Sequence, residues 1–149
     1  LHDALPIGSD HAAIDLRHEL AAAAIADGHT VLSETGPNES GDSVDYPDVA
    51  ATVCERVHAD PGTLGLLLCG TGQGVAIAAN KHVGIRAAVV LDGFSARMSR
   101  EHNDANVLCL GARVCGPGLA RMLLQTFLAA EFAGGRHARR VAKIDASGG

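Results

Sequence analysis

Short apolar runs of strand length alternate along this chain with longer alanine-rich stretches, and this alternation constrains the fold more than any other feature. Five such pairs fit into the 149 residues, and the longer stretches carry apolar residues at helical spacing. Strands that alternate with helices form a parallel sheet with helices on both of its faces. The sequence therefore predicts an α/β fold built on a five-stranded parallel sheet.

The bounds of these elements follow from the apolar spacing and from glycines and prolines. We expect strands ending near Ile7 and at 29–32, 64–69, 85–91 and 107–110. We expect helices at 12–27, at 47–59, from the glycine-rich turn to near Lys81, at 94–101 and at 119–132, followed by a basic tail at 134–149. The third strand is predicted to be central. Pro6 cannot donate a hydrogen bond to a neighbouring strand, so the first strand is predicted to be short or frayed.

Length and composition fit one domain over residues 1–149, without a long linker or an internal repeat. Hydrophobic residues make up 47% of the chain and charged residues 19%, which supports a packed core and excludes disorder as the main state. A net charge of -5 and only 3% aromatic residues argue against nucleic acid as a partner. Because the apolar runs are far shorter than the roughly 20 residues of a membrane helix, we expect no membrane partner.

The chain start and the cysteines predict the compartment. The opening residues lack the unbroken apolar stretch of a secretory signal, and residues 1–6 are interpreted as a truncated start or an added remnant. Cys54, Cys69, Cys109 and Cys115 form no C-x-x-C pair and no metal-ligand spacing, which disfavours a disulfide framework and structural zinc. We therefore expect a cytoplasmic protein.

Polar residues follow several of the predicted strands at the points where the strands end. In open parallel sheets, ligands bind beyond these carboxyl ends. The residues concerned are Ser9, Asp10 and His11 after the first strand, Cys69 to Gly74 after the third, Asp92 after the fourth, and Gly111 and Arg113 after the fifth.

The segment Cys69 to Gly74 places a thiol at a strand end, next to glycines whose backbone N–H groups can approach a ligand. A helix follows, and its N-terminus favours negative charge, so a thiolate and an oxyanion would both be stabilised there. This pattern predicts a base or nucleophile. The alternative is a tight turn around a buried, inert thiol.

A nucleotide-binding module is a second hypothesis. The phosphate-binding pattern G-x-x-x-x-G-K-[ST] is absent, and G-x-G-x-x-G fails because Gly70 and Gly72 are followed by Val75. Asp92 nevertheless follows the next strand, where a ribose-binding acid would be expected.

If the tail is helical, Arg136 and Arg140 are one turn apart and suit bidentate contacts to phosphate, although a charge run taken alone is more often a solvated basic tail. His102 and Asn103 follow a predicted helix and could be only its polar end. His11 beside Asp10 could accompany an N-cap.

Seven segments, considered together, form a more specific pattern. They are Gly8-Ser9-Asp10-His11, Asp45-Tyr46-Pro47-Asp48, Cys69-Gly70-Thr71-Gly72, Ile77-Ala78-Ala79-Asn80-Lys81, Gly84-Ile85-Arg86-Ala87, His102-Asn103-Asp104-Ala105-Asn106 and Gly134-Gly135-Arg136-His137. In this order they resemble the family of ribose-5-phosphate isomerase B, which includes galactose-6-phosphate and allose-6-phosphate isomerases. The resemblance extends from about Ile7 to Ile144.

The resemblance implies a Rossmann-like three-layer α/β/α sandwich and a homodimer, or a dimer of dimers, with active sites shared between subunits. It also implies metal-independent interconversion of ribose 5-phosphate and ribulose 5-phosphate through an enediolate, without a cofactor. The alternatives are an isomerase of allose 6-phosphate, galactose 6-phosphate or a tetrose phosphate, and a catalytically inactive subunit that binds a phosphorylated sugar.

The roles of individual residues follow from the same resemblance. Cys69 is expected to be the base, with Thr71 beside it, and His102 to open the sugar ring. The expected substrate-binding residues are Asp10 and Tyr46 near the sugar oxygens, Gly70, Gly72, Gln73 and Gly74 at the enediolate, Asn103, and His11, Arg113, Arg136 and Arg140 at the phosphate.

The chain departs from the family pattern at a few positions. One branch of the family uses a carboxylate of the glycine-rich loop instead of the cysteine, but here Cys69 is present and the loop residue is Gln73. Ala13 stands where the family usually has glycine, and Val75-Ala76 replaces Met-Ser. These departures leave the identity of the sugar open.

Overall fold

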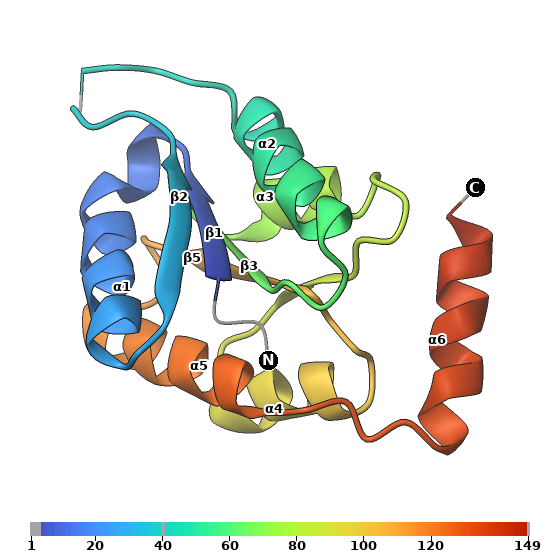
Figure 1. The fold of residues 1–149 in the computed structure, drawn as a ribbon. Coiled ribbons are helices and arrows are strands. Elements are labelled where there is room, and N and C mark those ends of the chain that lie inside the picture. Colours follow the sequence, from blue (N-terminus) through green and yellow to red (C-terminus); the bar gives the residue numbers. More distant parts are fainter. Residues whose placement is uncertain (1–3, 40, 149) are drawn as a thin grey trace.

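The structure, a computed structural model, describes residues 4–39 and 41–148 and contains a parallel sheet covered by helices (Figure 1). The elements in chain order are β1 (Ala4–Ser9), a 3-10 turn η1 (His11–Ala13), α1 (Ile14–Ala26), β2 (Thr30–Thr35), α2 (Tyr46–Ala59), β3 (Gly65–Cys69), α3 (Gln73–Ala79), β4 (Ala87–Val89), α4 (Gly93–Glu101), β5 (Val107–Gly111), α5 (Pro117–Ala129) and α6 (Arg136–Ser147). Within these described residues, no helix is long and apolar enough to cross a membrane.

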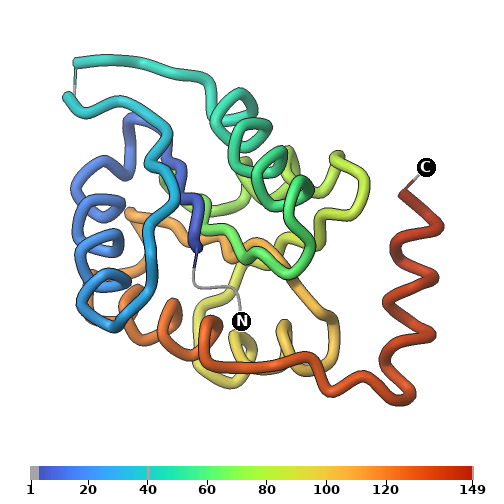
Figure 2. The backbone as a smooth tube through the Cα atoms, viewed as in Figure 1, coloured from blue at the N-terminus to red at the C-terminus, as the bar shows by residue number. Residues whose placement is uncertain are grey.

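The five strands are ordered β2-β1-β3-β5-β4 and every pairing is parallel, which confirms the predicted sheet and the central position of β3. Two apolar clusters hold the layers together. One joins the sheet to α1, α4 and α5, and the other joins its opposite face to α2 and α3 (Figures 1 and 2). Because both faces are covered, the central strands are apolar throughout, as the fully buried segments Leu66–Leu68 and Val107–Leu110 show.

The first strand differs from the expectation. β1 is six residues long and lies between β2 and β3, so the prediction of a short or frayed strand is wrong. The register between β1 and β2 shifts between Leu5 and Pro6, and pairing with β3 begins only at Ile7. The missing N–H of Pro6 therefore falls where the ladder is already interrupted. Residues 4–6 belong to β1, while 1–3 lie outside the described residues.

The bounds of β2 and β4 also differ from the expected ones, because strand pairing and side-chain hydrogen bonds determine where these strands begin and end. β2 continues to Thr35, since its last residues pair with β1. β4 covers only three residues, because the side-chain oxygens of Asn106 and Asn80 accept the backbone N–H groups of Arg86 and Ala87 in place of a ladder.

The basic tail forms a helix that stands apart from the two helical layers (Figure 1). This helix contacts the body through the ion pair between Arg86 and Asp145, with an N–O distance of 3.0 Å, and Ala133 in the segment before the helix donates a backbone hydrogen bond to Glu101. Only Val141 is buried among the described residues of this helix.

Candidate active site

A cavity of about 320 Å³ opens at the carboxyl ends of β1 and β3, where the chain connections leave in opposite directions across the sheet. This switch point is where ligands bind in open parallel sheets. The cavity is lined by Asp10, His11, Ala12, Tyr46, Cys69, Gly70, Thr71, Gly74 and Arg113. Eight of these nine are residues that the sequence predicted for the site. Larger cavities lie elsewhere, but none holds a thiol opposite a carboxylate at strand ends.

Cys69 is the last residue of β3 and only 5% of it is exposed. The backbone N–H of Gly72 donates to its Sγ at 3.2 Å. This hydrogen bond orients the sulfur, and the basic form of a cysteine is its thiolate. The short helix α3 follows directly, so the turn that holds the donor is fixed on both sides.

Close backbone contacts explain the glycines around this thiol. Gly72 has φ +81°, and a Cβ there would lie 3.0 Å from the carbonyl carbon of Leu110. A Cβ on Gly111 would collide with the backbone of Thr71. The turn after β3 and the end of β5 therefore pack backbone against backbone.

The packing of the turn after β3 against the end of β5 also positions Arg113, which follows β5. Its N–H donates to the carbonyl of Gly70 at 2.9 Å, and a Cβ on Gly70 would meet the guanidinium at 3.3 Å. The exposed side chain of Arg113 thus lies over the loop, where it can reach an anionic group in the cavity.

Three further side chains complete the cavity wall. Asp10 accepts the N–H of Ala12 at 2.9 Å and so caps the turn η1, which carries His11. The N–H of Val44 points to Nδ1 of His11 at 3.4 Å. Tyr46 opens α2, and its ring packs against Gly74, where a Cβ would lie 2.7 Å from Cε1.

In the loop itself, Thr71 is exposed, and its Oγ1 accepts the N–H of Gln73 at 3.2 Å. The hydroxyl proton of Thr71 is left to donate elsewhere. Gln73 is exposed at the start of α3.

Arg17 supports this site, and the sequence analysis missed it. The side chain is 1% exposed, although it lies on a helix among leucines and alanines. It donates to Ser9 Oγ at 2.9 Å, to the carbonyl of Pro37 at 2.6 Å and to Asn38 Oδ1 at 2.9 Å. It thereby ties the end of β1 to the loop after β2. An arginine on the apolar face of a predicted helix was the available signal.

The remaining predicted residues form a second group at the other edge of the sheet. His102 ends α4, and Asn103 follows it. Since α4 begins beyond the carboxyl end of β4 and runs back to the start of β5, its nine residues carry His102 about 13 Å toward the amino edge of the strands. Arg136 and Arg140 are exposed on the first turns of α6, close to the same end of α4. Asn103 lines a separate cavity with residues of α6.

The rings of His102 and His137 stack, with centroids 4.1 Å apart and planes 13° from parallel. Partial burial lowers the pKa of His137, and the neighbouring His102, Arg136 and Arg140 lower it further because each disfavours an added positive charge.

Burial favours the protonated thiol in two of the other cysteines, Cys54 and Cys109. Burial, and then the charge of Glu55, raises the pKa of Cys54 to about 12. Burial also raises the pKa of Cys109, with smaller effects of Cys54 and Cys69. All four cysteines are free thiols. Among the residues that the structure describes, no group of three or more His, Cys, Asp or Glu side chains could hold a metal ion.

Asp92 has a structural role that weakens the nucleotide hypothesis. Its two carboxylate oxygens accept the N–H of Ser95 at 2.7 Å and the hydroxyl of Ser95 at 2.8 Å. These hydrogen bonds lower the pKa of Asp92 and cap α4. A carboxylate engaged in this way is not directed toward a ribose.

Comparisons with known proteins agree with this arrangement. The family model described as Ribose/Galactose Isomerase matches residues 5–144. The chain is 42% identical over 142 residues to ribose-5-phosphate isomerase B of Escherichia coli, covering 95% of this chain and 94% of that protein. It is 44% identical over 140 residues to the D-erythrulose-4-phosphate isomerase of Pectobacterium atrosepticum, covering 94% and 91%.

Among solved structures, ribose-5-phosphate isomerase B of Clostridium thermocellum superposes with a TM-score of 0.92 at 49% identity, covering 97% of this chain and 96% of that one. The fold class expected from the sequence, a Rossmann-like three-layer sandwich, is thereby confirmed.

Proposed function

The chain belongs to the ribose/galactose isomerase family and is a sugar-phosphate isomerase, and from this we propose that it interconverts ribose 5-phosphate and ribulose 5-phosphate. One observation supports the chemistry above all others. The thiol of Cys69 receives the N–H of Gly72 inside a cavity that also holds Asp10 and Thr71. A basic group next to hydrogen-bond donors is what proton transfer beside a carbonyl requires.

In the proposed reaction, the Cys69 thiolate removes the proton from C2 of the open-chain aldose. The electron pair forms the C1–C2 double bond, and the negative charge moves to the oxygen on C1. The proton of the C2 hydroxyl passes to that oxygen, and the thiol returns its proton to C1. The product is the ketose, and no redox partner is needed.

The loop after β3 stabilises the enediolate. Its backbone N–H groups and the Thr71 hydroxyl donate to the oxygens on C1 and C2, where the charge develops. Asp10 and Tyr46 contact the remaining sugar hydroxyls. His11 and Arg113 bind the phosphate together with Arg136 and Arg140 of a second chain.

This last assignment requires a homodimer with shared sites, which we propose as the active form. Within one chain, His102, Asn103, Arg136 and Arg140 lie at the edge of the sheet opposite Cys69. Large apolar side chains are also exposed, among them Leu91 at 54%, Phe94 at 72% and Val114 at 52%. A second copy that covers such surface can bring its His102 group to the Cys69 cavity.

His102 serves ring opening in this proposal. Ribose 5-phosphate is mostly a closed furanose, and an imidazole can move a proton between its anomeric hydroxyl and its ring oxygen near neutral pH. Erythrulose 4-phosphate cannot form that ring. The presence of His102 therefore favours an aldose phosphate as the substrate.

We also propose that the protein works in the cytoplasm, because its cysteines are free thiols, as a reducing compartment keeps them.

A substrate panel tests the proposed reaction. The kcat/KM is measured on ribose 5-phosphate, allose 6-phosphate, galactose 6-phosphate and erythrulose 4-phosphate, and ribose 5-phosphate is expected to give the highest value. A higher value on any other sugar would refute the substrate assignment. An absence of turnover on all four would instead favour an inactive binding subunit.

Subunit complementation tests the shared site. Cys69→Ala and His102→Ala are each expected to be inactive on ribose 5-phosphate. In a randomly mixed dimer, half of the molecules are mixed and each mixed dimer has one intact site, so about a quarter of the wild-type activity should return. A mixture as inactive as its components, or an active monomer in sedimentation, would contradict the proposal.

A further inference from the structure

The stacked pair of imidazoles, His102 and His137, lies outside the Cys69 cavity of its own chain, and only His102 has a role in the proposed reaction. His102 is fixed by its backbone, since its N–H donates to the carbonyl of Met98 at 2.9 Å, but its side chain is only half-buried. The face of its ring lies against His137, with centroids 4.1 Å apart and an interplanar angle of 13°. Stacking covers one face and leaves the ring nitrogens, which lie in the ring plane, open to a ligand.

Backbone hydrogen bonds of His137 and of the segment just before it hold His137 in place. It lies in the first turn of α6, where its N–H donates to the carbonyl of Gly134 at 3.1 Å. Just before that turn, the N–H of Ala133 donates to the carbonyl of Glu101 at 2.9 Å. The segment that carries His137 is thus tied to the residue directly before His102.

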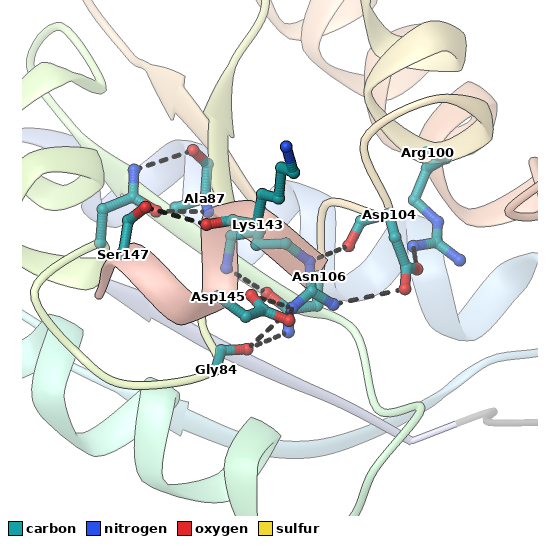
Figure 3. A network of polar contacts seen from close by, with 10 residues as sticks. Gly84, Ala87, Arg100, Asp104, Asn106, Lys143, Asp145 and Ser147 are labelled. Carbon is teal, nitrogen blue, oxygen red and sulfur yellow. Dashed lines mark hydrogen bonds and ion pairs between the residues drawn. The ribbon is translucent and has the colours of Figure 1, made fainter. Parts of the chain in front are cut away.

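The far end of α6 is tied to the same loop by a polar network (Figure 3). Arg86 donates to Asp145 of α6 at 3.0 Å and to the carbonyl of Asp104 at 2.8 Å. Arg100 contacts the carboxylate of Asp104 at 3.1 Å. The loop that begins at His102 is therefore fastened to α6 at both ends of the helix, and a shift of α6 would move the stacked rings together.

We propose that His137 is a positioning residue, which holds the His102 imidazole by stacking so that its ring nitrogens face the ring oxygen of the bound sugar. This inference rests on the proposed function of His102. It explains why a second imidazole lies here instead of a further guanidinium. A neutral ring can stack closely on His102, and the lowered pKa of His137, caused by burial and by His102, Arg136 and Arg140, favours its neutral form.

The test compares His137→Ala, which removes the stack, with His137→Phe, which keeps an aromatic face without ring nitrogens. Turnover of ribose 5-phosphate needs ring opening, whereas hydrogen exchange between solvent and the open-chain ribulose 5-phosphate does not. For His137→Ala we expect kcat on ribose 5-phosphate to fall about 10- to 100-fold with little change in KM, because the reacting group is misplaced. Exchange on ribulose 5-phosphate should stay within about threefold of wild type, and His137→Phe should recover most of the kcat.

Arg139→Ala is the matched control, since it changes an exposed neighbour on the same helix. The C–H resonances of the His102 ring give a readout independent of activity, because removing the stacked ring changes their chemical shifts. Unchanged shifts in His137→Ala would overturn the inference, and so would equal losses in both assays or equal losses in the Ala and Phe variants. Failure of the proposed function is distinct from these results, because it would already show as a wild-type enzyme inactive on ribose 5-phosphate.

Discussion

Replacing Cys69 by alanine should remove the proposed base and leave the fold intact. A positioned base contributes about 10²- to 10⁴-fold in rate, so kcat on ribose 5-phosphate should fall by that factor, about 3–5 kcal/mol in barrier height. The structural cost is smaller. One sulfur atom and its contact with the Gly72 N–H are lost, which should lower the free energy of unfolding by only about 1 kcal/mol. Initial rates measure kcat, deuterium incorporation at substrate C2 measures the proton transfer itself, and urea unfolding measures the free energy of unfolding.

Cys54→Ala is the matched control, because it removes the same atom from another buried position of the same apolar cluster. Burial and Glu55 raise the pKa of Cys54 to about 12, so this thiol stays protonated near neutral pH and cannot act as a base. We expect the control to lose similar stability and less than twofold in kcat. The reasoning would be refuted if Cys69→Ala kept more than a tenth of the wild-type kcat, or if Cys54→Ala lost as much activity.

Three further experiments examine the surrounding structure. Gly74→Ala would place a Cβ 2.7 Å from the tyrosine ring at the start of α2, so kcat/KM should fall about tenfold, whereas Gly118→Ala, with open space around it, should leave it unchanged. Arg17→Met should lower the free energy of unfolding by about 3 kcal/mol in urea titration, because several buried acceptors lose their donor; a loss under 0.5 kcal/mol would show that they find water instead. Arg136→Ala and Arg140→Ala should each raise KM for the phosphorylated sugar about tenfold, and unchanged kcat/KM in both would mean that these arginines form only a solvated face.

The sheet could be predicted from the sequence because each of its elements carries its own local signal. The run 64–69 is apolar apart from Gly65, which favours a central position, and the turn residues at strand ends marked the cavity. The predictions that were wrong concern strand bounds, which depend on pairing between segments distant in the sequence. The shift at Pro6 exists only because β2 offers a matching irregularity, and β4 is short because the side chain of Asn106 takes a backbone N–H. The position of α6 against the rest of the chain depends on contacts such as the ion pair between Arg86 and Asp145, which the local sequence pattern cannot reveal.

The candidate site was predictable to a similar extent and for a similar reason. Residues that follow strands meet at one edge whatever the details of packing, which is why Asp10, Cys69 and Arg113 were found together. The function of Arg17 was not found, because burial of a charged side chain depends on the loop that folds over it. His137 entered the sequence analysis only as the last residue of the segment 134–137, because its stacking on His102 depends on where α6 lies.

The position of His102 has a consequence that the order of elements alone imposes. In a parallel sheet every helix returns the chain to the amino edge, so a residue at the end of such a helix cannot meet a residue at the end of a strand in the same chain. Cys69 ends β3 and His102 ends α4. If both act on one sugar, as we propose, the site is completed by a second chain whatever the contacts of the interface are. Dissociation of the dimer should therefore abolish turnover of ribose 5-phosphate, while each separated chain keeps an intact cavity around Cys69.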